Sequence, residues 1–192
     1  MTEEQIKKGL SCAAFGFLFV LVNFNLNLNN LSVNVTPDFI GWILFFLAFD
    51  RLGKYTADKK YLKWMSLLQV ILTGAYWVLS IARASSDGAA QAADILRTIT
   101  TMIATVYFFI FFGSLVDVAR DFNSPRADTL HFLRYFNLIV DLALFMVSLF
   151  FILTGTVSAT ITLIFGVAAL VAAIATAVVL FRLRNDVRQA QA

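Results

Sequence analysis

The segment TPDFIGWILFFLAFDRLGK (36–54) contains an apolar run, FIGWILFFLAF (39–49), that is bounded by an acidic residue at each end. Pro37 suits the first position of a helix, because a residue there needs no backbone N–H donor. Asp38 beside it complements the positive end of the helix dipole. The segment therefore predicts an apolar helix over about 37–53, and five further segments of the chain have a similar composition.

The composition of the whole chain places that helix in a membrane protein. Of the 192 residues, 60% are hydrophobic and only 14% are charged, and the mean hydropathy is +0.80. A soluble domain has roughly half apolar and about a quarter charged residues. The excess gathers in long uncharged runs, which indicates an integral membrane protein made of one polytopic domain over residues 1–192.

Six segments come close to the length that a helix needs to cross the hydrocarbon core of a bilayer, which is about 20 residues. They are expected at about 3–23, 37–53, 62–82, 95–119, 129–153 and 159–183. The predicted fold class is therefore an all-α integral membrane protein with six transmembrane helices.

The basic residues predict the orientation of these helices. With six spans, thirteen of the 15 Lys and Arg residues fall on the side that carries both termini, and only Arg83 and Arg97 fall on the other side. Loops rich in Lys and Arg stay in the cytoplasm, so both termini are expected there. Topology thus explains the net charge of +3, and nucleic acid is not expected as a partner.

Tryptophans are enriched where a membrane helix meets the lipid headgroups. On the six-span map, Trp42 and Trp77 fall toward the outer ends of their helices, and Trp64 falls at an inner end. We therefore expect all three side chains near a membrane surface.

The segment FNLNLNNLSVNV (24–35) alternates apolar and polar residues, which is the period of a β-strand. A hairpin that turns at Asn29-Asn30 pairs like with like. The pairs are Leu28 with Leu31, Asn27 with Ser32, Leu26 with Val33, Asn25 with Asn34, and Phe24 with Val35. The alternative is a helical extension of the first span with four asparagines on one face. We favour a hairpin on the extracytoplasmic side, and its candidate functional residues are Asn25, Asn27, Asn29, Asn30 and Asn34.

The segment PDFIGWILFFLAFDRLGKY (37–55) resembles a pattern in small bacterial polytopic membrane proteins that have no known activity. In those proteins an Asn-rich extended stretch precedes Pro-Asp-Phe-Ile-Gly, an apolar helix and a lysine-rich loop. The resemblance covers about residues 15–65, and Trp42 stands where the pattern has Tyr. It implies a multi-pass protein of the bacterial cytoplasmic membrane, and it implies no activity, cofactor or site residue.

Asp141 is the sharpest candidate for a functional side chain, because it lies inside the fifth predicted span. An acidic residue in hydrocarbon costs about 2.5 kcal/mol or more when nothing compensates it. Arg134, Asn137 and Asp141 recur at helical spacing and form one polar stripe. The stripe indicates either a cytoplasm-facing pocket for a solute or proton, or a hydrogen bond from Asp141 to a neighbouring helix, for example to Gln69 or Tyr107.

Ala169, Ala173 and Ala177 recur every four residues in the sixth predicted span. Small residues at this spacing let two helices approach closely. The helix that they pack against belongs either to the same chain or to a second copy of it.

The chain has none of the motifs of nucleotide-binding, metalloprotease or serine-hydrolase sites. It has a single His and a single Cys, which leaves few groups for nucleophilic or metal-dependent chemistry. We therefore expect no enzymatic activity, no cofactor and no metal. The leading hypothesis is a non-enzymatic bundle that packs with itself or with a membrane partner in the lipid bilayer. The alternative is a small-solute or proton-coupled transporter or channel that uses the stripe on the fifth helix.

Overall fold

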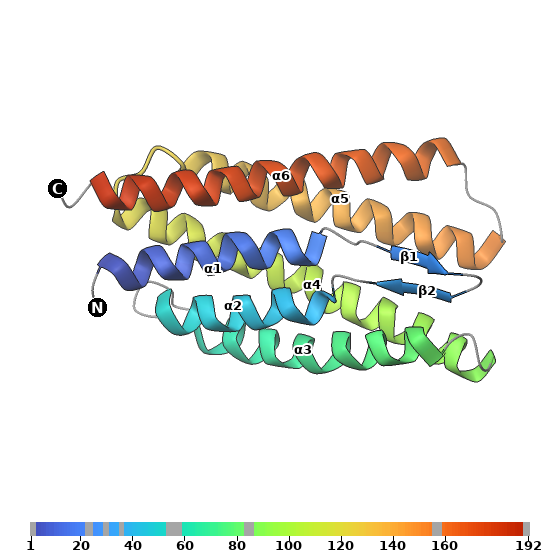
Figure 1. Cartoon of the computed structure of the whole chain (residues 1–192). Coiled ribbons are helices and arrows are strands. Elements are labelled where there is room, and N and C mark those ends of the chain that lie inside the picture. Colours follow the sequence, from blue (N-terminus) through green and yellow to red (C-terminus); the bar gives the residue numbers. More distant parts are fainter. Residues whose placement is uncertain are drawn as a thin grey trace.

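The computed structural model describes residues 3–21, 25–28, 31–34, 37–52, 59–82, 87–154 and 159–189 (Figure 1). They form α1 (Glu3–Leu21), β1 (Asn25–Leu28), β2 (Leu31–Asn34), α2 (Asp38–Leu52), α3 (Lys59–Ala82), α4 (Asp87–Asp121), α5 (Ala127–Thr154) and α6 (Ala159–Gln189). The predicted helical class is confirmed. α4 begins earlier and α6 ends later than the sequence predicts, because hydropathy marks only the apolar part of a helix.

The helices are arranged as a closed ring. Each helix packs against the next one in the chain, and α6 packs back against α1. Figure 1 shows both termini at the same end of the bundle, which we call the terminal end; the opposite one is the far end. Because α1 lies between α2 and α6, the first and last helices of the chain are neighbours.

Four of the helices are long and apolar enough to cross a membrane. The qualifying stretches among the described residues are Lys60–Ala82, Gln91–Asp121, Ala127–Val147 and Leu163–Val187. The prediction of six spanning helices is therefore supported for only four. α2 has 15 residues, which corresponds to about 22 Å of helix against a hydrocarbon core near 30 Å. α1 has 19 residues, but its first two turns carry four charged side chains.

The strands β1 and β2 pair antiparallel between α1 and α2. The paired residues are Asn25 with Asn34, Leu26 with Val33, Asn27 with Ser32, and Leu28 with Leu31. These are four of the five pairs of the hairpin interpretation. The turn residues Asn29 and Asn30 and the fifth pair lie outside the described residues. β2 packs beside α3, and Figure 1 shows both strands continuing toward the far end from α1 and α2.

The connection from α4 to α5 turns sharply through a Schellman motif. Asn123 has a left-handed backbone with φ of 51°, which asparagine tolerates better than most residues. The N–H of Ser124 donates to the carbonyl of Ala119 at 2.8 Å, and the N–H of Asn123 donates to that of Arg120 at 3.0 Å. The hydroxyl of Ser124 then accepts from the N–H of Arg126 at 3.2 Å. One residue thus completes the end of α4 and caps the start of α5.

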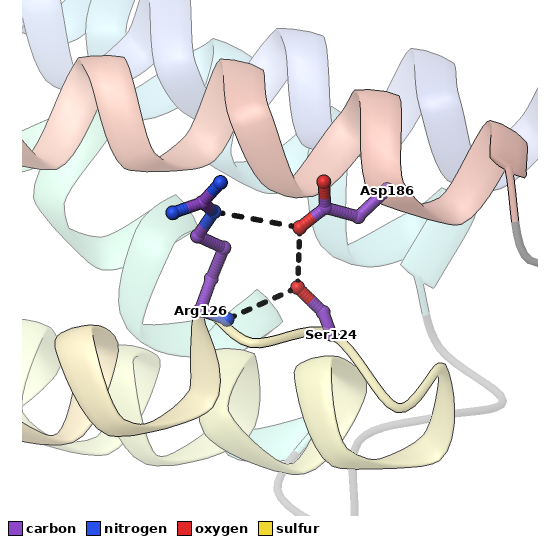
Figure 2. A network of polar contacts seen from close by, with 3 residues as sticks. All are labelled: Ser124, Arg126 and Asp186. Atoms are coloured by element: carbon purple, nitrogen blue, oxygen red, sulfur yellow. Dashed lines mark hydrogen bonds and ion pairs between the residues drawn. The ribbon is translucent and has the colours of Figure 1, made fainter.

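This turn is fastened to the last helix by a small polar network (Figure 2). The hydroxyl of Ser124 donates to a carboxylate oxygen of Asp186 in α6 at 2.6 Å. The Nε atom of Arg126 lies 3.5 Å from the same oxygen. The network ties α6 to the α4–α5 connection at the terminal end.

α1 and α2 approach each other most closely where two glycines cross. A Cβ atom added to Gly41 would lie 2.7 Å from the carbonyl oxygen of Gly16, and one added to Gly16 would lie 2.9 Å from that of Gly41. Neither backbone can give way without moving its helix. The absence of side chains at both positions therefore allows the short helix α2 to lie directly against α1.

An aromatic cluster fills the bundle between α1, α2 and α4. Its members are Phe17, Trp42, Phe45, Phe49, Tyr107, Phe108, Phe111 and Phe112. The ring centroids of Trp42 and Tyr107 are 4.9 Å apart, as are those of Phe17 and Phe108. Trp42 is only 1% exposed, because the aromatic side chains of α4 cover it, and its nearness to a membrane surface stays a prediction. α2 begins inside the bundle, and the residues one turn after its start are already buried.

Candidate functional site

A cavity of about 210 Å³ lies beside the aromatic cluster, and α1 to α5 all contribute to its walls. Phe17, Trp42 and Phe108 belong both to the cluster and to the cavity wall. The polar side chains of the wall include Asp38, Gln69, Thr73, Thr100, Asn137 and Asp141. The cavity therefore gathers acidic, amide and hydroxyl groups from four helices of a largely apolar bundle.

Two of the three residues in the predicted polar stripe reach this cavity. Asn137 and Asp141 are one turn apart on α5, so both side chains face the same side of the helix. Asp141 is half-buried, and no ion pair or hydrogen bond joins it to another described residue. The predicted alternative, a hydrogen bond from Asp141 to Gln69 or Tyr107, is therefore not what the described residues form.

Arg134, the third residue of the stripe, lies elsewhere. Its guanidinium carbon sits 3.9 Å from the ring centroid of Phe109, and a Cβ atom added to Gly113 would meet that carbon at 3.2 Å. It lines a second cavity of about 260 Å³ together with Asp117, Arg120 and His131. Helical side chains lean toward the helix N-terminus, so a long side chain two turns before Asp141 points away from it. Arg134 thus packs α5 against α4 and does not neutralise Asp141.

Asp38 joins Asp141 at the first cavity, although the sequence indicated only a helix start there. It stands in the first turn of α2, and its Oδ1 atom is buried without a hydrogen-bond partner among the described residues. Arg97 of α4 is near enough to act on it electrostatically. The one signal in the sequence was the shortness of the apolar run 39–49.

Gln69 is the most deeply buried polar group of the site, with no exposed surface. Its Nε2 atom donates to the backbone carbonyl of Thr100 at 2.8 Å, which links α3 to α4. Its Oε1 atom is buried and has no partner within the described part of the chain. A buried amide oxygen without a donor costs about 1–3 kcal/mol, so Gln69, whose side chain lines the cavity, carries an unfilled acceptor.

The other predicted sites lie apart from this cavity. Ala173 and Ala177 are buried within the chain on α6, which packs against α1 and α5, and Ala169 is half-buried. Packing within one chain therefore accounts for Ala173 and Ala177. Of the hairpin asparagines, Asn25, Asn27 and Asn34 are in the strands, while the others fall outside the described residues.

The described residues contain no group of three or more His, Cys, Asp or Glu side chains that could hold a metal ion. The chain matches no protein-family model, no curated protein and no solved structure. Its function is therefore inferred from the geometry of the cavity and the bundle around it.

Proposed function

We propose that this protein binds a small solute inside its helical bundle and carries it across a membrane. One observation supports this proposal above all others: Asp38, Gln69 and Asp141 face a single cavity within an apolar bundle. Helix packing does not need carboxylates, and a carboxylate is costly in a medium without water. Ionisable groups at such depth are typical of solute and ion pathways.

In this proposal the chain crosses the bacterial cytoplasmic membrane six times, with the terminal end in the cytoplasm and the hairpin toward the outside. The 13-to-2 distribution of basic residues and the location of both termini at one end support this orientation. Four crossings are long helices. α1 and α2 complete the other two with the hairpin strands. Non-helical backbone is tolerated at that depth where protein covers it or where it borders water, and β2 lies beside α3.

The described conformation is closed toward the cytoplasm. Along α2, Asp38 and Trp42 line the cavity, and Phe45 and Phe49 follow them toward the terminal end. These aromatic rings fill the bundle between the cavity and the cytoplasmic side. A transported solute would thus enter from the outside, and its release inward would need the aromatic cluster to part.

Water access to the cavity tests the proposal. In a Cys12→Ser background, Thr73→Cys places a thiol on the cavity wall, and Ile71→Cys places one on the outside of the same helix. Thr73 is 6% exposed and Ile71 is 62% exposed. The proposal requires that lipid surrounds the bundle and that water fills the cavity. A charged methanethiosulfonate added to intact cells should therefore modify Thr73→Cys at least about tenfold faster than Ile71→Cys, because lipid excludes the charged reagent.

The opposite order of rates would overturn the proposal, since it would mean that the bundle exterior is wet and the cavity is dry. If the reagent modifies Thr73→Cys only when it reaches the cytoplasmic side, as it does in inverted vesicles, the cavity is still a solute site. The solute would then enter it from the cytoplasm and not from the outside. Transport would then be established if vesicles with the reconstituted protein take up a solute and vesicles with the Asp141→Asn variant do not.

A partner or a homo-oligomer stays a prediction. α6 exposes a broad apolar face at Leu163, Val167, Leu170, Val171 and Ile174. Contact with lipid accounts for such a face as well as a second protein does. The absence of enzymatic activity likewise stays a prediction.

A further inference from the structure

The threonine hydroxyl protons of the cavity wall are all donated to backbone carbonyls. Each of the wall threonines donates its hydroxyl proton to a backbone carbonyl one turn earlier: Thr73 to Gln69 at 2.6 Å, Thr100 and Thr101 to Arg97 at 2.8 and 2.9 Å, and Thr105 to Thr101 at 3.1 Å. The amide groups each donate one of their two N–H protons to a backbone carbonyl. Asn137 donates to the carbonyl of Leu133 at 2.8 Å, and Gln69 donates to that of Thr100.

What remains on these side chains is mostly acceptors, beside one N–H on each amide. A threonine hydroxyl that donates its only proton still has lone pairs, and an amide that donates from nitrogen still has its oxygen. Asp38 Oδ1 and Gln69 Oε1 are buried and have no donor among the described residues. Acceptors outnumber free donors on this wall, so a ligand with N–H or O–H groups of its own satisfies more of it than an acceptor-only ligand does.

The charge of the wall points the same way. Asp38 and Asp141 supply two carboxylates. Arg97 acts on Asp38, as does the positive end of the α2 dipole. Asp141 has no cationic partner among the described residues. The balance near Asp141 is negative, so a positively charged ligand is favoured there.

The rest of the cavity wall is aromatic, and the volume of the cavity is larger than the volume of a bare ion. Phe17, Trp42 and Phe108 present ring surface to the cavity. A cation is attracted to an aromatic face, most strongly to tryptophan. An apolar cavity of about 150 Å³ accepts a benzene molecule, so the 210 Å³ here has room for an organic ion of similar size.

We infer that the ligand of this cavity is a small organic ammonium ion, a protonated amine whose N–H groups meet the oxygens of Asp38, Gln69 and Asp141 while its carbon skeleton lies on Trp42 and Phe108. This inference rests on the proposed solute site and names the chemical class of the solute. Proton transfer and transport of an alkali cation are the competing outcomes of its test.

Three compounds of one shape provide that test: benzylammonium, benzyl alcohol and benzoate. Each is added at 10 mM to the full-length protein in nanodiscs, and the melting temperature is measured in N-methylglucamine buffer. Benzylammonium should raise Tm by about 3 °C, as expected for a ligand near ten times its Kd, and the other two should not. Benzylammonium should also slow modification of Thr73→Cys at least about tenfold.

Asp141→Asn keeps the shape of the side chain and removes its charge, so it should weaken benzylammonium binding by about tenfold or more. Asp117→Asn is the matched control, because Asp117 lies in the other cavity, and it should leave the affinity unchanged. A variant that fails to fold is recognised by its melting curve without ligand. The Thr73→Cys protection by benzylammonium then still decides the question in the parent chain.

The inference is overturned if the alcohol or the carboxylate stabilises the protein as well as the amine does, or if Na⁺ protects Thr73→Cys and the amine does not. It is also overturned if none of these compounds protects a thiol that reacts readily. In these cases a reactive Thr73→Cys still supports a solute site. An unreactive Thr73→Cys thiol, by contrast, would mean that the cavity is not a solute site.

Discussion

Gln69 is the side chain at which folding and binding make opposite demands. Its oxygen is buried without a donor, which lowers stability, yet the same side chain lines the cavity and leaves that oxygen free to accept from a ligand. Natural sites commonly retain groups that weaken the fold because binding requires them.

Replacing Gln69 by Met should separate the two demands. The volume is similar, and the loss of one hydrogen bond to Thr100 is offset by removal of the unpaired oxygen. The free energy of unfolding should therefore stay within about 1 kcal/mol of the parent value or rise. The stabilisation by benzylammonium should be lost, and parallel melting curves with and without the amine measure both effects. A strongly destabilised variant would mean that Gln69 serves mainly to join α3 to α4.

Ser124 illustrates a side chain that serves stability alone. Its hydroxyl donates to Asp186 and accepts from the backbone of Arg126. Ser124→Ala should lower the free energy of unfolding by about 2 kcal/mol, since a helix cap and a hydrogen bond to a carboxylate are both lost. Ser80→Ala is the control, because among the described residues Ser80 donates only to the Trp77 carbonyl in its own helix, and its effect should stay below about 0.5 kcal/mol. Equal losses of stability would show that the network in Figure 2 contributes little.

The pairing of α1 with α2 depends on backbone contact at Gly16 and Gly41. A methyl group at Gly41 has nowhere to go, because the nearest atom is a carbonyl oxygen of α1. Since α2 forms part of the cavity wall, any displacement of α2 also moves Asp38. Close packing here is therefore a condition for the site as well as for the fold.

Gly41→Ala should destabilise the protein by about 1–3 kcal/mol, as overpacking of a tight contact does. Gly74→Ala is the matched control, since no atom lies within 4 Å of a Cβ added there, and alanine favours helix by up to about 1 kcal/mol. Denaturant titration of the two variants in the same detergent provides the comparison. If Gly41→Ala is as stable as the parent, the helices are free to separate at this crossing.

The apolar helices, the strand pairing and the pair Asn137–Asp141 followed from the sequence because each depends on local periodicity. The meeting of Asp141 with Asp38 and Gln69 did not, since it depends on which helices are neighbours and how deep each one starts. The burial of Trp42 was missed for the same reason, since it depends on the packing of Tyr107 and Phe108 of α4 against α2. Arg134 was misassigned because spacing places Cα atoms on one face without fixing where a long side chain ends.

The proposed six-crossing topology gives the whole bundle one orientation in the membrane, with thirteen of its basic residues assigned to the cytoplasmic side. Gln91 and Thr129 are exposed positions near the starts of α4 and α5. In the Cys12→Ser background, Gln91→Cys should react with an impermeant maleimide in intact cells, and Thr129→Cys should react only after the cells are opened. Reaction of both cysteines from the outside would contradict the six-crossing topology. If only Thr129→Cys reacts in intact cells, the protein has the opposite orientation in the membrane.

The contact between α1 and α6 also has a consequence for biosynthesis. α6 begins at Ala159, so at about 5–20 residues per second it leaves the ribosome roughly 10–30 s after α1. Until then one flank of the earliest helix faces lipid or the insertion machinery. The ring is thus completed only once α6 has been translated, and a nascent chain released before that point has a cavity wall but no closed ring of helices to support it.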